Sequence, residues 1–422
     1  MVEKSTRHSP EKKENYMSQT QHLLSGYKVL DFTQVLAGPT TTRLMAEMGA
    51  EIIKVELMPN GEISRNLPFI KNGRSGYYIQ QNRGKKSLCI DARHPKGQGI
   101  IKNLIKKVDV VVENFSPGTI ARLGFGYDVV KTINPKVIMC SISALGQTGP
   151  LSSIPGYDYI GQAYAAVTHL IGDPNGAPSF PMLGLGDVST GVHAYAAIAS
   201  ALLYRERTGQ GQYIDVTLLD SYFHCHELSV QLYSGTNGAV EPKRSGSHHY
   251  AVSPAGLFKG KKQYFFILCL EHQWSVLCKA MGKPELIDDP RFSTNAKRVE
   301  HQKDVVQVLE GWIQAQASDD EALRLLHAGH VPAAPVLSVP EAINHPHLRA
   351  RRTVRRVKDP LFGEVDIPGM PLKFSAFPEE LPLQAASLGE HNEEVLRTHL
   401  SYTPEQVQQL ESEGVLKRDP TK

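Results

Sequence analysis

The sequence predicts an α/β protein with a large Rossmann-like, doubly wound domain and a smaller α+β domain. Residues 27–56 read as a strand, a helix and a second strand, and such a β-α-β unit of about 30 residues is the start of a parallel sheet. The alternation of strands and helices continues to residue 233 and then changes character. A chain of 422 residues also exceeds one small domain, so two domains are expected.

Short apolar runs mark the strands of the large domain. The first two are expected at residues 27–32 and 50–56, joined by a helix over residues 40–48. Further strands are expected at 86–91, 109–113, 136–142 and just before residue 216, and helices at 95–107, 187–205 and 217–233. Four or more strands with intervening helices favour an open parallel sheet, which usually receives its ligand at the carboxyl ends of the strands.

Domain boundaries follow from these elements. Residues 1–24 are polar and are expected to form a disordered extension, residues 25–220 the large domain, and residues 221–242 a linker helix. A strand at 263–268 and charged helices at 304–316 and 319–328 predict a small domain over residues 243–335. Residues 336–366 are expected to be a connector, and residues 367–422 to return to the large domain with a closing helix at 384–400.

Composition excludes several classes of protein. Lys and Arg number 46 against 43 Asp and Glu, so a general nucleic-acid or membrane-surface role has no electrostatic support. The five cysteines are scattered without a Cys-x-x-Cys pair, which favours reduced, buried thiols over disulfides or zinc. No apolar run reaches the roughly 20 residues of a membrane span. The start of the chain has no apolar signal-peptide core. We expect a cytoplasmic protein with no membrane or nucleic-acid partner.

Asp187 is the candidate catalytic residue. It stands in Leu183-Gly-Leu-Gly-Asp-Val-Ser-Thr-Gly191, at the start of a long alanine-rich helix. An aspartate between glycines stands clear of its own backbone, where a large electrophile reaches it and the carboxylate acts as a covalent nucleophile. An aspartate at a helix start is also a common N-cap, so this feature alone leaves both interpretations open.

Three arginines follow the ends of expected strands, namely Arg65, Arg93 and Arg122. The guanidinium fork suits phosphate oxygens, so the three together predict a site for nucleotide phosphates, while a solvated surface position is the alternative for each. The turn at residues 33–39 carries one glycine and lacks the Gly-x-Gly-x-x-Gly pattern, which argues against NAD. His224-Cys-His-Glu227 predicts no metal site, because positions two apart face different sides of a helix.

A series of short motifs follows in a fixed order along the chain: Val29-Leu-Asp-Phe-Thr33, Ala37-Gly-Pro39, Glu51-Ile-Ile-Lys-Val-Glu56, Asn82-Arg-Gly-Lys-Lys-Ser87, Val112-Glu-Asn-Phe115, Gly146-Gln-Thr-Gly-Pro150, Gly156-Tyr-Asp158 and Thr208-Gly-Gln-Gly-Gln-Tyr-Ile-Asp215. In this order they resemble the class III (CaiB/BaiF-type, formyl-CoA transferase-like) coenzyme A transferases. The resemblance covers residues 26–415. Each motif alone is weak, and their combination is specific.

The resemblance implies a Rossmann-like large domain, a smaller second domain, and a homodimer whose chains interlock like linked rings. It places the nucleophile at Asp187. Matched position by position, it assigns contacts with CoA to Val35, Leu36, Ala37, Ile90, Arg93, Asn114, Phe115, Arg122, Tyr157 and Asp158, and Arg65 joins them as a phosphate-suited arginine. CoA and acyl-CoA are then substrates, and no tightly bound cofactor is expected.

The chemistry suits a carboxylate nucleophile. Moving CoA between two carboxylic acids without hydrolysis passes through a mixed anhydride, which keeps the acyl group activated, and then through an aspartyl-CoA thioester. Water has to be excluded, so the loop at residues 244–250 is a candidate cover. Gly246, His248 and His249 in this loop are candidates for contacting the acceptor acid, with a polar surface turn as the alternative.

Two other functions stay open. An acyl-CoA racemase or epimerase shares the family, but its motif is Gly-His-Asp, and this chain has Gly156-Tyr-Asp158, so one of the two bases is missing. A non-catalytic CoA-binding protein would bind without forming an adduct. Leu36 stands where the formyl-CoA transferase branch has glutamine, and Leu57 where that branch has arginine. Together with His248 and His249, Leu36 favours a dicarboxylate acceptor and succinyl-CoA as donor.

Overall fold

The computed structural model describes residues 22–419, which fall into two compact units. Within the described chain, unit 1 contains residues 22–165, 182–226 and 346–419, and unit 2 contains residues 166–181 and 227–345. The extension expected over residues 1–24 lies outside the described residues apart from residues 22–24. Of these, Leu24 donates its N–H to the carbonyl of Met48 at 2.7 Å.

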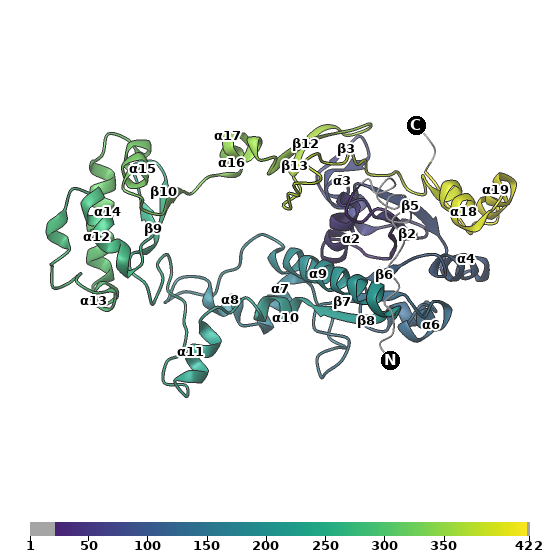
Figure 1. The fold of residues 1–422 in the computed structure, drawn as a ribbon, viewed down its shortest axis with the longest axis horizontal. Coiled ribbons are helices and arrows are strands. Elements are labelled where there is room, and N and C mark those ends of the chain that lie inside the picture. Colours follow the sequence, from purple (N-terminus) through teal and green to yellow (C-terminus); the bar gives the residue numbers. More distant parts are fainter. Residues whose placement is uncertain (1–21, 420–422) are drawn as a thin grey trace, which may run out of the picture. The chain divides into compact units, whose positions relative to one another are not determined.

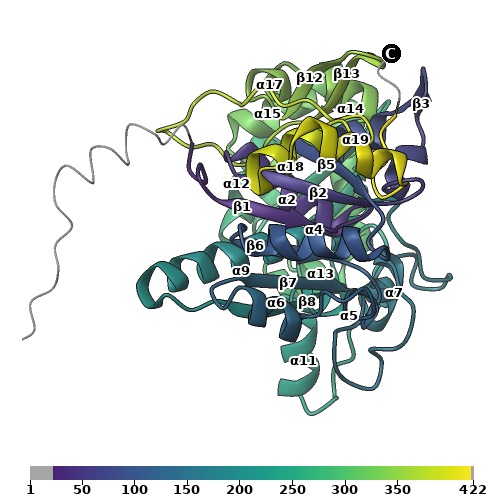
Figure 2. The same cartoon turned by 90° about the vertical axis from the view of Figure 1, so that its right-hand side faces the viewer.

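Unit 1 is built on a six-stranded parallel sheet with the order β5-β2-β1-β6-β7-β8 (Figure 1 and Figure 2). Its strands are β1 (Lys28–Asp31), β2 (Glu51–Leu57), β5 (Lys85–Ile90), β6 (Val110–Glu113), β7 (Ile138–Ser143) and β8 (Gln212–Thr217). From β1 the chain first adds strands on one side and then, from β6 on, on the other. The strand order therefore reverses between β1 and β6, and open α/β sheets bind their ligands at such a point.

Helices cover both faces of this sheet. On one face α2 (Ala37–Glu47) and α9 (Leu185–Thr208) lie side by side and pack on strand residues such as Val29 and Val110 (Figure 1). On the other face lie α4 (Pro95–Ile105), α6 (Tyr127–Ile133), α18 (Asn392–Leu400) and α19 (Pro404–Ser412), which pack on residues such as Leu30 and Val111 (Figure 2). Successive strand residues are thus buried on opposite faces, as in a doubly wound sheet. The mixed α/β class with a large parallel sheet is confirmed.

Shorter elements complete unit 1. They are η1 (Ile63–Asn66), β3 (Ile70–Lys71), β4 (Arg74–Ser75), α3 (Gly76–Asn82), α5 (Thr119–Arg122), α7 (Asp158–Tyr164), α10 (Leu218–Phe223), α17 (Pro346–Ala350), β12 (Val354–Asp359) and β13 (Gly363–Pro368). The pair β12 and β13 forms an antiparallel hairpin. Most of the expected connector at residues 336–366 therefore has regular structure, and from residue 346 on it belongs to unit 1.

Two expected helices are shorter than the sequence pattern suggested. The helix expected at 217–233 is broken after Phe223, where the chain turns and the ring Nε2 of His226 bonds the carbonyl of Ala165 at 2.7 Å. The linker helix expected at 221–242 is therefore absent, and α11 (Ser229–Gly235) stands in that range. The helix expected at 384–400 begins only at Asn392. Before it, the carbonyl of Gln384 accepts from Gly84 and Gly389 donates to Ser87, so these backbone groups bond to segments far away in sequence.

Unit 2 has a three-stranded antiparallel sheet with the order β11-β10-β9. Its elements are α8 (Val167–Leu170), α11, β9 (Ala255–Lys259), β10 (Tyr264–Leu268), η2 (Glu271–Gln273), α12 (Trp274–Ala280), η3 (Pro284–Leu286), α13 (Asn295–Glu300), α14 (Gln302–Ala315), α15 (Asp319–Ala328), β11 (Ala333–Pro335) and α16 (Val339–Asn344). Phe265, Trp274 and Leu309 lie in its core. Residues 166–181 join this unit because Gly246 and Arg244 donate to the carbonyls of Gly172 and His169, at 3.1 and 2.9 Å.

Candidate active site

A groove opens in unit 1 beside the carboxyl ends of β1, β6 and β7, where the strand order reverses. Its volume is about 270 Å³, and all of its lining residues belong to unit 1. The predicted residues that line it are Val35, Leu36, Ala37, Asn114, Phe115, Tyr157 and Asp187. The structure therefore brings the candidate nucleophile together with the loops that follow three neighbouring strands.

Asn114 joins two of these loops. The N–H of Gln34 donates to Oδ1 of Asn114 at 2.7 Å, and Nδ2 of Asn114 donates back to the carbonyl of Gln34 at 2.8 Å. These paired bonds connect the loop after β1 to the loop after β6. Asn114 thus shapes the groove through the backbone of Gln34 as well as lining it.

Asp187 lies in the first turn of α9, which begins at Leu185 after the N-cap residue Gly184. The N-cap interpretation of Asp187 is therefore wrong, because the helix starts two residues before it. Its backbone N–H donates to Oδ2 of Asp158 at 2.9 Å. A carboxylate from α7 thus satisfies this first-turn N–H, and the side chain of Asp187 is left to line the groove.

Asp158 is buried beside the first turn of α9, with 5% of its surface exposed, and it does not line the groove. Its Oδ1 accepts a hydrogen bond from the hydroxyl of Tyr222, which in turn accepts one from Nε2 of Gln162 at 3.2 Å. A Cβ on Gly186 would lie 2.1 Å from the Tyr222 ring, so only glycine fits there. Asp158 and Tyr222 together hold the turn that carries Asp187.

The pKa of Asp187 is raised to about 7, first by burial and then by the neighbouring carboxylate of Asp158. Near neutral pH the carboxylate is therefore only partly ionised, and it is more basic than an aspartate in water. Strongly perturbed carboxyl groups in a groove are typical of catalytic sites.

Replacing Asp187 by asparagine is expected to stabilise the protein above pH 7 and to change its stability little at pH 4. The raised pKa means that the fold favours the protonated acid. That contribution is complete below the unfolded value of 3.8 and is lost as the pH rises through about 7. The gain at pH 8 is expected to be on the order of 1–3 kcal/mol, because solvent in the groove screens the charge. Urea unfolding of both proteins from pH 4 to 8 measures it, and a difference independent of pH would contradict the assignment.

Besides Asp158, four more of the predicted CoA contacts lie away from the groove. Arg65 donates to the two carboxylate oxygens of Glu56 at 2.7 and 2.6 Å, so its guanidinium is paired with a buried carboxylate. Ile90 is fully buried in the sheet core, as an apolar strand residue is expected to be. Arg93 is exposed just after β5, and Arg122 is exposed at the end of α5, the short helix that follows β6. Nη2 of Arg122 donates to Thr119 at 2.7 Å.

The predicted loop residues Gly246, His248 and His249 lie in unit 2. His248 meets the ring of Phe258 edge-on at 5.1 Å, and burial lowers its pKa. The ring of His249 stacks on Tyr250 at 4.9 Å, and its Nδ1 accepts from the N–H of Ala251 at 3.0 Å. Local contacts thus hold both histidine rings.

The sequence analysis did not single out the apolar part of the lining. Ile63 comes from η1, Ile142 and Leu145 from the end of β7 and the loop after it, and Ile154 from the loop before α7. The position of Ile142 and Leu145 at a strand end is a signal that could have found them. Ile63 begins the short helix η1 and Ile154 lies in a loop, and neither position follows a strand end.

In the described part of the chain, no group of three or more His, Cys, Asp and Glu side chains is arranged to hold a metal ion. No helix between residues 22 and 419 is both long enough and apolar enough to cross a membrane. All five cysteines are free thiols, and Cys225 is exposed whereas the other four are buried as expected.

Comparisons with known proteins agree on one family. A model of CoA-transferase family III matches residues 24–392. The chain is 35% identical to succinyl-CoA:glutarate CoA-transferase of Mus musculus, over 94% of this chain and 91% of that protein. It is 33% identical to formyl-CoA:oxalate CoA-transferase of Streptomyces coelicolor, over 94% of this chain and all of that protein. A CAIB/BAIF family protein from Brucella suis has a similar structure, with a TM-score of 0.78 and 32% identity over 90% of this chain and all of that one.

Proposed function

The chain belongs to CoA-transferase family III, and we propose that it moves coenzyme A from an acyl-CoA donor to a carboxylic acid through covalent intermediates on Asp187. The observation that carries this proposal is the placement of Asp187. Its carboxylate lines a groove at the switch point of the sheet, and its pKa is raised to about 7.

The proposed reaction has four balanced steps. A carboxylate oxygen of Asp187 attacks the thioester carbon, the C–S bond breaks, and CoA leaves as a thiolate from a mixed anhydride. The thiolate then attacks the aspartyl carbonyl, which releases the donor acid and leaves an aspartyl-CoA thioester. The acceptor carboxylate displaces CoA from it to form a second anhydride. The thiolate finally attacks the acceptor's acyl carbon, which yields the new acyl-CoA and restores Asp187.

The lining of the groove supports the proposal that the thioester end of CoA binds in the groove. Leu36, Phe115 and Ile142 offer an apolar wall, and no Lys, Arg or His lines the groove in the described part of the chain. The phosphates of CoA would then bind outside it. Arg93 and Arg122 are exposed after strands whose carboxyl ends share one edge of the sheet, which supports a role for them with phosphates.

The donor proposed here is succinyl-CoA, and the acceptor is a dicarboxylate. The mouse relative carries succinyl-CoA and glutarate in its name, which supports this pair. His248 and His249 stay the candidates that the sequence offers for contacting the free carboxylate of the acceptor. A panel of acyl-CoA donors and acids, followed by chromatography of the CoA esters, identifies the pair that turns over fastest.

A homodimer is part of the proposal. Around the start of α9, exposed apolar side chains follow one another in sequence, and they are Met182, Leu183, Leu185, Val188 and Val192. Exposed apolar patches mark protein interfaces, so a second copy of the chain covering this segment would remove them from water. Light scattering of the purified protein would then give twice the mass of one chain.

Mass spectrometry of a trapped intermediate tests the reaction. Incubation with succinyl-CoA followed by rapid acid quench and digestion is expected to add the mass of an acyl group or of CoA to the peptide that contains Asp187. Tight binding with no adduct on any peptide would favour a non-catalytic CoA-binding protein. Loss of α-deuterium from a branched acyl-CoA without an acceptor acid would instead indicate a racemase.

A further inference from the structure

Val35 has a strained backbone conformation in the wall of the groove. Its φ is +65°, in the left-handed region that a β-branched residue occupies only under constraint. Such a conformation costs about 1–3 kcal/mol and persists where its surroundings hold it, most often at functional sites. Specific contacts are therefore expected to hold Val35 in this conformation.

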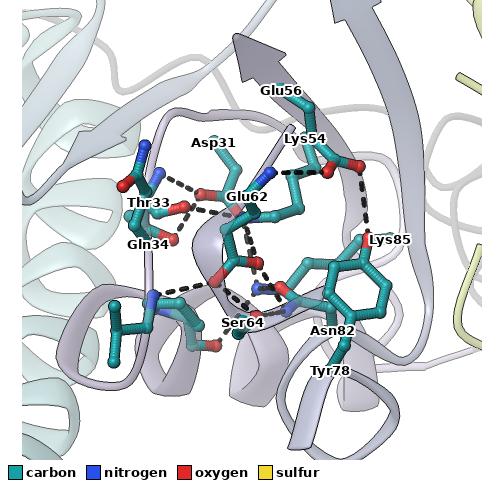
Figure 3. Close-up of polar contacts among 12 residues, drawn as sticks. Asp31, Thr33, Gln34, Lys54, Glu56, Glu62, Ser64, Tyr78, Asn82 and Lys85 are labelled. Atoms are coloured by element: carbon teal, nitrogen blue, oxygen red, sulfur yellow. Dashed lines mark hydrogen bonds and ion pairs between the residues drawn. The ribbon is translucent and has the colours of Figure 1, made fainter. Parts of the chain in front are cut away.

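Glu62, directly before η1, holds it through a carboxylate that also contacts Lys54, Ser64 and Asn82 (Figure 3). Oε1 of Glu62 accepts from the N–H of Val35 at 2.8 Å and from the hydroxyl of Ser64 at 2.6 Å. Its Oε2 accepts from Nδ2 of Asn82 at 2.7 Å and pairs with Nζ of Lys54 at 3.3 Å. Only 2% of the surface of Glu62 is exposed, so these bonds are made in a medium of low dielectric constant, where they are strong.

The residues on either side of this contact are fixed as well. Lys54 is fully buried and donates to the carbonyl of Thr33 at 2.7 Å, while Asn114 holds the backbone of Gln34 from both sides. Each of three successive backbone positions is thus bonded to a different side chain. The contact from Glu62 is the one made at the strained residue.

The next residue carries this constraint to the nucleophile. Leu36 is the N-cap residue of α2, and its Cδ2 lies 2.4 Å from the place that a Cβ of Gly184 would occupy. Gly184 is the N-cap of α9, three residues before Asp187. The conformation of Val35 therefore sets where Leu36 packs against the turn that carries Asp187.

We propose that Glu62 is a positioning residue of the transfer reaction, which holds Val35 in the left-handed conformation and so fixes Leu36 against the first turn of α9. This inference rests on the reaction proposed for Asp187 and deepens it. Glu62 itself touches no reacting atom and acts through the backbone of Val35.

A double-mutant experiment on the full-length protein tests the proposal. Glu62→Gln removes the charge and turns an amide toward the donors Asn82 and Lys54, which loosens the bond to Val35. It is expected to lower kcat by about tenfold or more, because a misplaced reacting group slows catalysis, with KM for acyl-CoA changed less than about threefold. Glycine adopts φ = +65° without strain. In the Val35→Gly background, Glu62→Gln is therefore expected to lower kcat less than about threefold relative to Val35→Gly alone.

Asp359→Asn is the matched control. Asp359 is also buried, pairs with Arg74 at 3.0 Å, and accepts from the backbone N–H groups of Leu361 and Phe362. This variant is expected to lose stability while keeping the kcat of its folded fraction. Hydrogen exchange of the backbone amides at residues 35–37 is expected to accelerate about tenfold in Glu62→Gln and to stay unchanged in Asp359→Asn.

Several outcomes would overturn the inference. One is an equal loss of kcat from Glu62→Gln in both backgrounds, because Glu62 would then act through general stability. Unchanged kcat, or unchanged exchange at residues 35–37, would overturn it too. If Glu62→Gln does not fold, the charge-balanced variant Glu62→Gln/Lys54→Met replaces it in the same comparison. A wild-type protein without CoA transfer would refute the proposed function, and the exchange measurement would still decide whether Glu62 holds Val35.

Discussion

Replacement of Asp187 by alanine is expected to abolish CoA transfer, with kcat lowered by at least about 10⁴-fold. Every proposed step forms or breaks a bond to this carboxylate, so no remaining group can carry the acyl chain. The loss is expected in kcat, while the dissociation constant for CoA changes less than about threefold, because the groove has other walls. Steady-state transfer assays and calorimetric titration with CoA measure the two quantities.

Asp128→Ala is the matched control for this variant. Asp128 is also an acidic residue in the first turn of a helix, α6, and it is exposed on the surface. Asp128→Ala removes an exposed charge from a helix start, which changes stability by a few tenths of a kcal/mol to about 1 kcal/mol. Only Asp187→Ala removes the proposed nucleophile. If Asp187→Ala and Asp128→Ala transferred CoA at similar rates, the covalent mechanism on Asp187 would be refuted.

The sheet could be predicted because its strands are buried on both faces. Runs such as Val110–Glu113 are nearly all apolar, and the helices between them show their own period, so the parallel architecture follows from pattern alone. The position of the groove could be predicted in part, because open α/β sheets bind their ligands at the carboxyl ends of the strands. Residues 35–37 and 114–115 were therefore within reach of sequence reasoning.

The buried charges could not be predicted in the same way. Lys54 and Glu56 stand in the β2 sequence as charged residues, and charged residues are mostly exposed. They are instead 0% and 1% exposed, because Glu62 and Arg65 reach them from η1 and the residue before it, later in the chain. The residues next to Lys54 and Glu56 in the sequence give no indication of such pairs. The pairing of Arg65 with Glu56 was likewise not expected from the sequence.

Irregular segments account for the remaining differences. The left-handed conformation of Val35 is unfavourable for its β-branched side chain. It is explained by the hydrogen bond that its N–H donates to Glu62, a residue outside its own loop. The segment before α18 looks helical in sequence, but its backbone groups bond to Gly84 and Ser87, which lie about 300 positions earlier. Local propensity is a weak guide wherever tertiary bonds of this kind compete with it.

Asp31→Ala is expected to lower the free energy of unfolding by about 3–5 kcal/mol at pH 7, the largest stability effect among the variants considered. Asp31 is fully buried and accepts from Thr33, and its Oδ2 lies 3.2 Å from Nζ of Lys85 (Figure 3). Thr42 also donates to Oδ2 of Asp31. Its partners lower its pKa to about 2 in spite of burial. Its stabilising contribution is therefore present above about pH 4 and is lost as the pH falls toward 2.

The pH dependence of this loss identifies its cause. Burial lowers the pKa of Lys85 to about 8 even beside Asp31, and removal of Asp31 lowers it further. Since Lys85 can then lose its proton, the deficit of Asp31→Ala is expected to be smaller at pH 9 than at pH 6. Asp31→Ala/Lys85→Met, which removes both charges, is expected to be more stable than Asp31→Ala at pH 7.

Asp366→Ala, at a more exposed pair with Arg349, should change stability by no more than about 1 kcal/mol. Urea unfolding at each pH measures the deficit of Asp31→Ala. A deficit that stays constant from pH 6 to 9 would show that lost packing destabilises the variant, and not an uncompensated buried cation.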